Sequence, residues 1–172
     1  MSFLSKIISI IALTILVSLP VSANSDIAVL DFELNDVTSN PGVAEEIERT
    51  GSLKRQLEES LSAKGGYRIV SIDPATQEAA TKGFGYLWDH PDEAAALGKN
   101  SGSRFVLVGR VHKPSFLFVY LMAHLIDTRT GEVIGDFIVE VKGQQKNFTA
   151  KGIENLARQI DARFQTVRGS KT

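Results

Sequence analysis

The residues best suited to chemistry are three acids that follow an early apolar run. Asp31 and Glu33 lie near the end of IAVLDFEL, residues 27–34, and Asp36 lies in the loop behind it. Open α/β sheets collect ligands at the carboxyl ends of their strands, where carboxylates can bind a cation or transfer protons. No Asp-x-Asp-x-Asp-Gly loop or second acid cluster accompanies them, so solvated or capping carboxylates are the simpler interpretation.

An aromatic segment is the second candidate. Phe84, Tyr86 and Trp88 alternate in residues 83–91, which we expect to be irregular, and His90 follows them. Such a segment can stack on a ligand and roof the acids, or it can hold the loop against the sheet. The second role is the more common one for buried rings.

The sequence predicts no metal site, cofactor or catalytic set. The three histidines are His90, His112 and His124, and none stands at a zinc-ligand spacing; the chain has no cysteine. A zinc site needs three or four converging ligands. No Gly-x-Ser-x-Gly elbow marks a nucleophile, so nucleophilic catalysis is not indicated either.

The N-terminus predicts export. Lys6 precedes thirteen uncharged residues, 7–19, and Pro20 and Val21-Ser22-Ala23 follow. This is the layout of a secretory signal peptide, and its apolar run is shorter than the roughly 20 residues that span a bilayer. We therefore expect residues 1–23 to be cleaved after Ala23, leaving residues 24–172 as one periplasmic domain without an integral membrane span. Without a cysteine, a bacterial lipid anchor is not expected.

The charge balance excludes one class of partner. The formal net charge is -1, and removal of Lys6 would make it -2. A nearly neutral chain gives no general case for nucleic acid. Arg104, Arg110 and the segment 112–115 make a basic hairpin end, which we interpret as a solvated rim.

Hydrophobic periodicity predicts the strands and helices, with residues 75–82 forming a turn or two of helix before the helix 92–99 in the same crossover. The expected strands are 27–34, 67–72, 104–112, 116–127 and 132–142, and the expected helices are 43–64, 75–82, 92–99 and 147–164. In the helix 43–64, Val43, Ile47 and three leucines form the apolar face, and Gly51 interrupts it. The predicted fold class is α/β (α+β), a mixed sheet of about five strands in the order β-α-β-α-β-β-β-α. The short links between the last three strands predict an antiparallel meander.

The strand 116–127 is apolar on both faces, which is typical of an interior strand. One face carries Phe116, Phe118, Tyr120 and Met122, and the other carries Leu117, Val119, Leu121 and Ala123. If the loop 128–131 holds four residues, Asp127 faces Glu132 and Met122 lies beside Phe137. The aromatic face is then the main core, and the leucine face lies beside Asp136 and Glu140, covered by a helix or by a partner.

The turn LIDTRTGEVIG, residues 125–135, serves to fix this register. Asp127 is expected to accept hydrogen bonds from amides across the bend, and Gly131 to supply a positive φ. The bland interpretation, a structural turn rather than a reactive cluster, is the preferred one.

Three stretches together resemble a bacterial envelope domain: IAVLDFEL, residues 97–136, and FTAKGIENLARQI. They are similar to the N-terminal domain of TolB, to the CsgG-like curli assembly domain and, above all, to a bacterial family of unknown function whose members are small exported proteins. The motifs of that family correspond to Val111, Lys113, Ser115 and Leu117; to Asp127, Thr130 and Gly131; and to Phe148, Lys151 and Gly152. Relatives carry a cysteine pair where this chain has residues 87–91 without one, which weakens a redox or metal role.

Two functions follow as hypotheses. The first is a non-catalytic accessory protein of the envelope that binds another envelope protein, or itself, through the exposed meander around Asp136 and Glu140 and through the aromatic loop. The second is a small-molecule binder or hydrolase with Asp31, Glu33 and Asp36 under Trp88 and His90. A closed pocket with converging acids would favour the second; acids spread into solvent would count against it.

Overall fold

The computed structural model describes residues 25–142 and 146–169. Its strands are β1 (Ser25–Val29), β2 (Glu33–Asp36), β3 (Tyr67–Ile69), β4 (Phe105–Lys113), β5 (Phe118–Asp127) and β6 (Val133–Lys142). Its helices are α1 (Ala44–Gly51), α2 (Leu53–Lys64), α3 (Pro74–Ala80), α4 (Tyr86–Asp89), α5 (Pro91–Asn100) and α6 (Lys146–Gly169). The predicted mixed α/β class is confirmed. The predicted signal peptide and the side chain of Phe148 lie outside the described residues.

One mixed sheet organises the fold. Its strand order is β3-β1-β4-β5-β6, and β2 pairs with β4 beyond the end of β1. β1 runs parallel to β3 and β4, whereas β4, β5 and β6 form the predicted antiparallel meander. Parallel neighbours require crossover segments, and the helices between β1, β3 and β4 supply them.

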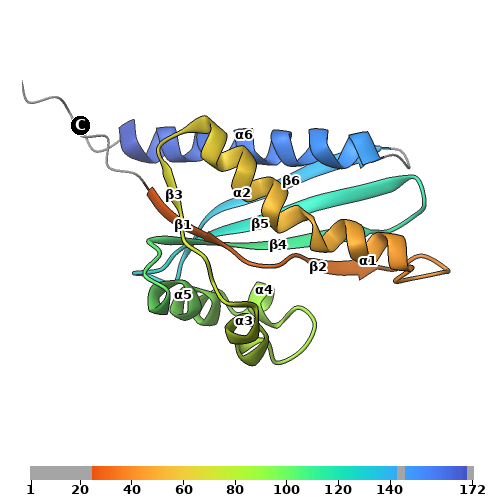
Figure 1. The fold of residues 1–172 in the computed structure, drawn as a ribbon, viewed down its shortest axis with the longest axis horizontal. Helices are drawn as coiled ribbons and strands as arrows, with labels where there is room; N and C mark the ends of the chain where they lie inside the picture. The colour runs from red at the N-terminus through yellow and green to blue at the C-terminus, as the bar shows by residue number, and fades with distance from the viewer. Residues whose placement is uncertain (1–24, 143–145, 170–172) are drawn as a thin grey trace, which may run out of the picture.

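Helices cover the two faces of the sheet unequally (Figure 1). α2 and α6 bury the larger core against β1, β4, β5 and β6, including Leu57, Leu125 and Phe164. On the other face, α3, α4 and α5 lie over one end of the sheet only (Figure 1). A smaller core beneath them contains Val106, Val108 and Ile126. The sheet is therefore enclosed on one side and partly bare on the other.

The first strand is broken, contrary to the prediction of one strand over residues 27–34. The break falls at Leu30–Phe32, and β2 then pairs in parallel with the second half of β4, which makes six strands. The Phe32 ring lies on Gly109, where an added Cβ would come within 2.5 Å of the ring. The Phe32 side chain therefore packs over β4 at Gly109, the position where β4 has no side chain.

The helix 43–64 is divided where Gly51 predicts an interruption. α1 ends at Gly51, and α2 begins at Leu53 after Ser52, whose hydroxyl donates to the Arg49 carbonyl at 2.7 Å. One expected core residue is wrong: Ile47 is 58% exposed. The new direction of α1 buries Glu46 instead, which becomes important below.

The register of β5 and β6 corrects the predicted faces. A β-bulge opposite Leu125 and Ile126 inserts one residue, so that Ala123 rather than Met122 pairs with Phe137. A slip of one residue moves every side chain to the other face. The leucine face of β5 is therefore the core, with Leu121 3% exposed and Leu125 fully buried. The expectation of an aromatic core was wrong.

The turn between β5 and β6 has the predicted chemistry. The Asp127 carboxylate accepts a hydrogen bond from the Arg129 amide at 2.8 Å, and Gly131 has φ 76°. The sequence did not reveal a further partner: both carboxylate oxygens of Asp127 bind the Arg104 guanidinium. This pair ties the turn to the start of β4. Arg104 is accordingly no part of a solvated rim.

Candidate functional site

The bare part of the sheet is the candidate site, and we name it the open face. It begins where α4 and α5 end and consists of side chains that pair directly across three strands. These are Arg110 and His112 of β4; Phe118, Tyr120, Met122 and His124 of β5; and Asp136, Ile138, Glu140 and Lys142 of β6. Val108, which pairs with His124, lies under the α5 layer, so all of these side chains share the face of the smaller core.

The register arranges the open face in rows. One row runs Glu33, Arg110, Met122, Ile138; the next runs Asn35, His112, Tyr120, Glu140; a shorter one runs Val108, His124, Asp136. Directly opposed side chains on one face lie close enough to interact. Contacts bear this out: Asn35 Nδ2 lies 3.1 Å from His112 Nδ1, and the rings of His112 and Tyr120 stack at 6.3 Å. The face thus combines rings, amides and charges.

Trp88 joins the aromatic segment to the open face. Its ring stacks on His124 with 3.7 Å between centroids, and the Arg110 guanidinium lies 4.7 Å from its centre. Arg110 also lies 5.1 Å from the centre of Phe84. A guanidinium over an aromatic ring is stabilised by the ring quadrupole. The prediction that the loop is held against the sheet by its rings agrees with this geometry.

The surroundings of His124 favour its neutral form. Burial lowers its pKa from the ordinary value of 6.5, the nearby Asp136 opposes that shift, and the positive charge of Arg110 adds to it. Its Nε2 lies 3.5 Å from the Asp136 carboxylate. A buried imidazole beneath a tryptophan resists protonation because charge is costly away from water.

Two buried polar atoms on the open face are left without partners. Among the described residues, the Arg110 Nε and the His124 Nδ1 make no hydrogen bond. Buried polar groups are nearly always paired in folded proteins, so an unpaired one calls for an explanation. Both atoms lie beside Trp88 of α4, where the helical layer ends and the bare part of the sheet begins.

Glu33 is tied to the same corner. Its carboxylate accepts from the Arg110 Nη2 at 3.1 Å and from the Gly85 amide at 3.0 Å. Gly85 has φ 80°, and a Cβ there would lie 3.0 Å from that guanidinium. Only a glycine fits comfortably at this position. Glu33 therefore anchors the aromatic loop and does not serve as a free acid.

The three acids predicted as a site do not converge. Asp31 lies 3.5 Å from Lys54, beside a hollow of about 220 Å³ that also touches Glu33 and Gln77. Asp36 accepts hydrogen bonds from Thr38 and Gly42 and lies 3.8 Å from the buried Lys113. Burial raises the pKa of Asp36, but these hydrogen bonds and Lys113 outweigh it and lower that pKa overall.

His90 and Glu140 have local partners. The His90 ring stacks on Tyr86 at 4.2 Å, and its Nδ1 lies 2.9 Å from the Tyr86 carbonyl oxygen. Glu140 forms an ion pair with Lys142 at 3.1 Å. Of the predicted residues, the structure brings together Glu33, Trp88 and Asp136 through Arg110 and His124. It leaves Asp31, Asp36 and His90 elsewhere.

Sequence reasoning missed the residues that connect this site. Arg110, His112, Tyr120, Met122 and His124 were not chosen, although the alternating pattern of β4 and β5 places them on one face. His112 and His124 are not cross-strand neighbours, because they pair with Tyr120 and Val108. Choosing them required knowledge of the β-bulge opposite Leu125 and Ile126, and no local sequence pattern predicts that bulge.

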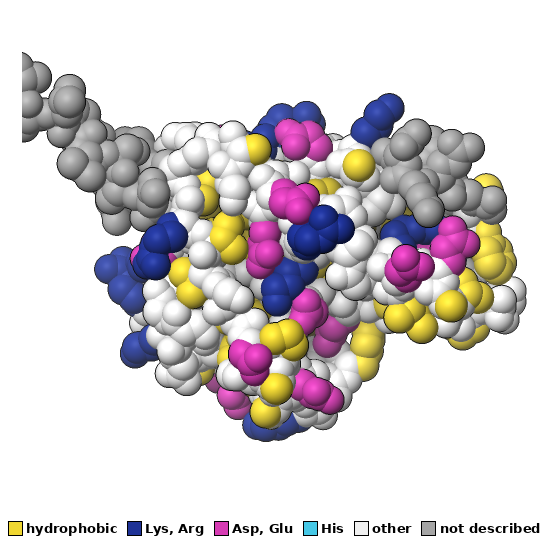
Figure 2. Space-filling view, in the orientation of Figure 1, with side chains coloured by type: hydrophobic (Ala, Val, Ile, Leu, Met, Phe, Trp, Pro, Cys, Tyr) yellow, Lys and Arg dark blue, Asp and Glu magenta, His cyan; other side chains and the backbone are white. Residues whose placement is uncertain are grey.

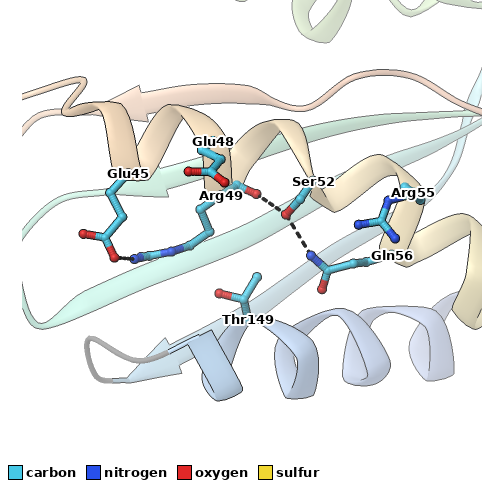
Figure 3. A pocket seen from close by; sticks show the side chains of 7 residues that line it. All are labelled: Glu45, Glu48, Arg49, Ser52, Arg55, Gln56 and Thr149. Carbon is cyan, nitrogen blue, oxygen red and sulfur yellow. Dashed lines mark hydrogen bonds and ion pairs between the residues drawn. The ribbon is translucent and has the colours of Figure 1, made fainter.

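A second hollow lies between the first two helices and the start of α6 (Figure 3). It has a volume of about 380 Å³ and is lined by Glu45, Glu48, Arg49, Ser52, Arg55, Gln56 and Thr149. Most of its polar groups already bind one another: Arg49 binds Glu45 at 3.4 Å, and Gln56 donates to Ser52 at 2.8 Å. Four of its lining residues, Glu45, Arg49, Ser52 and Gln56, are therefore engaged with one another.

One end of the molecule is apolar. Val37, Phe116, Leu117 and Phe118 are each at least 37% exposed, and they belong to the ends of β2 and of the β4–β5 hairpin. Figure 2 shows hydrophobic side chains gathered at that end, whereas charges of both signs alternate over the middle of the molecule. The open face runs into this end at Phe118.

The described residues contain neither a metal-binding cluster nor a membrane-spanning helix. In residues 25–142 and 146–169, no three His, Cys, Asp or Glu side chains gather as a metal site would require. Within the same ranges, no helix has the length and apolar character needed to cross a bilayer.

Several solved bacterial structures have a similar fold. The C-terminal domain of LpoB from Salmonella enterica is 21% identical, covering 72% of this chain and 87% of its own, with a TM-score of 0.51. The PelC dodecamer from Paraburkholderia phytofirmans is 17% identical over 82% of this chain and 88% of its own, with a TM-score of 0.54. Lipoprotein GNA1162 from Neisseria meningitidis is 16% identical over 80% of this chain and 96% of its own, with a TM-score of 0.52. No curated protein sequence matches.

At these identities the likeness concerns the fold alone. Sequence similarity to a family is more specific, because it follows residues rather than the path of the backbone. Residues 25–160, which include every strand of the sheet, match DUF3280, described as "Protein of unknown function (DUF2380)", and the chain belongs to this family.

Proposed function

We propose that this protein is an exported, non-catalytic accessory protein of the bacterial cell envelope that binds another envelope protein through the open face. In this proposal residues 1–23 are a signal peptide removed after Ala23, and residues 24–172 act as one domain in the periplasm. The similar folds include a lipoprotein and LpoB, which supports a place in the envelope. Binding rather than catalysis is favoured because the acids do not converge.

The observation that carries the proposal is the pair of unpartnered buried nitrogens beside Trp88. Buried polar atoms without a partner are costly, and because Trp88 already shields both nitrogens, a partner can pair with them only by displacing that ring. The face around them mixes Trp, Tyr, Met and Arg, which are enriched at the centres of protein interfaces. Ile138, 53% exposed at the middle of the face, supplies an apolar contact point.

Homo-oligomerisation is the competing form of this function. The PelC structure is a dodecamer, so the partner at the open face can be another copy of the same chain. A sedimentation measurement of the purified protein separates the two forms. A monomer at micromolar concentration indicates a different partner, and a closed oligomer that Ile138→Glu dissociates indicates self-association.

The test is site-specific photocrosslinking in the intact cell. A photoreactive amino acid at position 138 is expected to give a discrete adduct, and Trp88→Ala is expected to reduce it. The same amino acid at Ser62, an exposed position on α2, is the matched control and should give none. Equal crosslinking at positions 62 and 138 would show that the open face is not a specific interface.

Export is tested separately. The mass of the purified protein should correspond to a chain that begins at Asn24. A protein that keeps residues 1–23 would refute the cleavage site without affecting the open face.

The small-molecule alternative has weaker support. The hollow at the end of β1 is small, and the acids beside it are engaged by Lys54, Arg110 and the Gly85 amide. A hydrolytic site would need at least one of these carboxylates free to reach a substrate.

A further inference from the structure

The geometry points to a second binding surface at the outer edge of β6, which we propose accepts an extended, acidic segment of a partner protein as an added strand. This surface lies at the sheet edge beside α6 and adjoins the open face at Glu140 and Lys142. Four observations carry the proposal: the unpaired edge, the groove beside it, the basic row on α6 and the separation of α6 acids from that row.

The first observation is the edge itself. β6 has ten residues and ends the sheet, with β5 as its one neighbour among the described strands. Every second residue of an edge strand directs its amide and carbonyl away from the sheet. Natural proteins usually cover such an edge, shorten it or bend it, because it can pair with another chain.

One end of the edge is already closed. The Arg163 side chain crosses Gly135, and its Nε donates to the Ile134 carbonyl oxygen at 2.6 Å. No corresponding bond to another described residue covers the outer side of Asp136–Lys142. The open length is therefore that segment of seven residues, which suits a short added strand.

The second observation is a groove along this length. It has a volume of about 430 Å³ and is lined by Val139–Lys142 of β6 and by Lys151, Gly152 and Asn155 of α6. Gly152 sits against Leu121 and Val141, where a Cβ would come within 2.8 Å of both. The helix backbone is thus held close to the strand, and the side chains on either side of Gly152 form the groove wall.

The third observation is the charge of that wall. Lys151 lines the groove, Arg158 donates to the groove residue Asn155 at 2.8 Å, and Arg163 reaches the β6 backbone. All three are exposed. Lys151 and Arg163 form a basic row along the side of α6 that overhangs the edge, and Arg158 borders it beside Asn155.

The acids of α6 lie on its other side. Glu154 binds Lys64 of α2 at 2.9 Å, and Asp161 accepts from Tyr67 of β3 at 2.6 Å. Both acids are therefore engaged away from the edge, while Glu154, three residues after Lys151 and four before Arg158, offsets part of the charge of these two cations. On β6, Asp136 projects to the open face, and Glu140, which lines the groove, already forms an ion pair with Lys142 at 3.1 Å.

The chemistry of the occupant follows. An added strand alternates its side chains between the two faces. The side chains of the added strand that point toward α6 lie beside the basic row, so they should be acidic. The side chains that point toward the open face lie beside Ile138, Asp136 and Glu140, so they should not be acidic. A second copy of this chain fits poorly, because symmetric pairing of β6 would bring two basic rows together. Strand addition of this kind draws affinity from the main chain and specificity from alternate side chains.

Peptide probes test the proposal on the protein as purified from the cells that make it. The probe is a blocked, fluorescent peptide of about eight residues, long enough at 3.4 Å per residue to span the open edge, with glutamate and threonine alternating. Fluorescence anisotropy measures its dissociation constant. The matching lysine–threonine peptide should bind at least about tenfold more weakly, a difference of ~1.4 kcal/mol.

Backbone methylation distinguishes strand addition from simple charge attraction. A strand bonds to β6 along one of its two edges, so methylating alternate amides blocks one edge only. Of the two alternately N-methylated forms of the glutamate peptide, one should bind like the parent and the other should not bind. Equal binding by both forms would overturn the proposal.

Charge-reversed variants locate the site. The double variant Lys151→Glu with Arg158→Glu should weaken the glutamate peptide by about tenfold or more, and Lys99→Glu with Arg129→Glu, two exposed cations away from β6, should leave it unchanged. Hydrogen exchange should show protection of the amides in residues 136–142 on binding. A glutamate peptide that does not bind, or that binds both double variants alike, would overturn the proposal; so would a dimer that protects those amides without peptide. The open-face variant Trp88→Ala tests the other surface without changing a residue of β6, so either proposal can fail alone.

Discussion

The two faces of the sheet are built from similar residues but differ in how completely their polar groups are paired. On the face under α2 and α6, the buried cation Lys113 binds Glu46 at 2.9 Å. On the open face, Arg110 and His124 are also mostly buried, yet each retains an unpaired nitrogen. An enclosed face must satisfy its polar groups within the chain, whereas an open one can leave them for a partner. The comparison therefore supports recognition as the role of the open face.

The largest expected difference concerns two isoleucines. Ile160 is fully buried under the sheet and Ile138 is 53% exposed on the open face. Ile160→Ala should reduce the free energy of unfolding by about 2–5 kcal/mol, and Ile138→Ala should change it by less than about 0.5 kcal/mol. Urea denaturation of both variants checks this. Similar losses would mean that the open face is a part of the core and would remove the basis of the comparison.

The second prediction concerns two lysines. Lys113, whose side chain is 7% exposed, lies beside Glu46 and the 2% exposed Asp36, whereas Lys142 is 74% exposed. Lys113→Met should cost about 3–5 kcal/mol, because it leaves buried carboxylates without a counter-charge. Lys142→Met, the control on the open face, should cost less than about 0.5 kcal/mol. Adding Glu46→Gln to Lys113→Met should recover part of the loss; no recovery would assign the loss to packing instead of charge.

The sequence predicted the framework of the fold well. Hydrophobic periodicity located the meander and the long helices, and short links required antiparallel pairing. The DTRTG segment identified the turn, and Gly51 identified the break between α1 and α2. The resemblance to a bacterial family of unknown function is confirmed, while its finer likeness to TolB and CsgG remains a prediction. These features depend on local sequence, which is why they could be read from it.

The site was harder to predict because it depends on register. A single bulge residue reverses the faces of β5, and a strand that is apolar on both sides gives no local sign of the reversal. The same limit hid the partners of the predicted acids. The sequence predicted a solvated or capping role for Asp36, and the pairing of β2 also places it beside Lys113. Glu33 binds Arg110 because β2 pairs with β4 at that residue. Pairing across the sheet, and not residue type, decided each role.

A third prediction compares two aspartates. Asp127, the last residue of β5, binds Arg104, whereas the side chain of Asp136 on the open face is 62% exposed. Asp127→Asn should cost about 1–3 kcal/mol at neutral pH, and Asp136→Asn should cost little. Burial opposes the ionisation of Asp127, but hydrogen bonds and charge from Arg104 and Arg129 outweigh it, so its pKa lies below the ordinary 3.8. A lowered pKa stabilises the fold above the ordinary value, and that stabilisation is lost as the pH falls through the pKa in the fold.

Unfolding measured at descending pH should therefore show the difference between wild type and Asp127→Asn shrinking in acid. A difference that stays constant to the lowest pH at which the protein folds would show that the charge of Asp127 contributes nothing.

The smallest effect belongs to His124, and it bears directly on the open face. Its pKa is lowered by burial, so the unfolded chain binds a proton more readily than the fold does. The free energy of unfolding should therefore be highest above the ordinary pKa of about 6.5 and fall as the pH drops through the lower pKa of the folded protein. The groups around the ring are Trp88, Arg110, Asp136 and Asp89. Removing the ring in His124→Gln should flatten this decline between about pH 8 and pH 5.

Trp88→Ala, which opens the imidazole to water, should flatten the decline as well, whereas Ile138→Ala should keep the wild-type slope. If Trp88→Ala left the pH dependence of the free energy of unfolding unchanged, Trp88 would not be the group that shields His124 from water. A bound partner that covers the same corner should lower the pKa of His124 further. The affinity for the partner should then fall as the solution is acidified, and it should fall more for wild type than for His124→Gln.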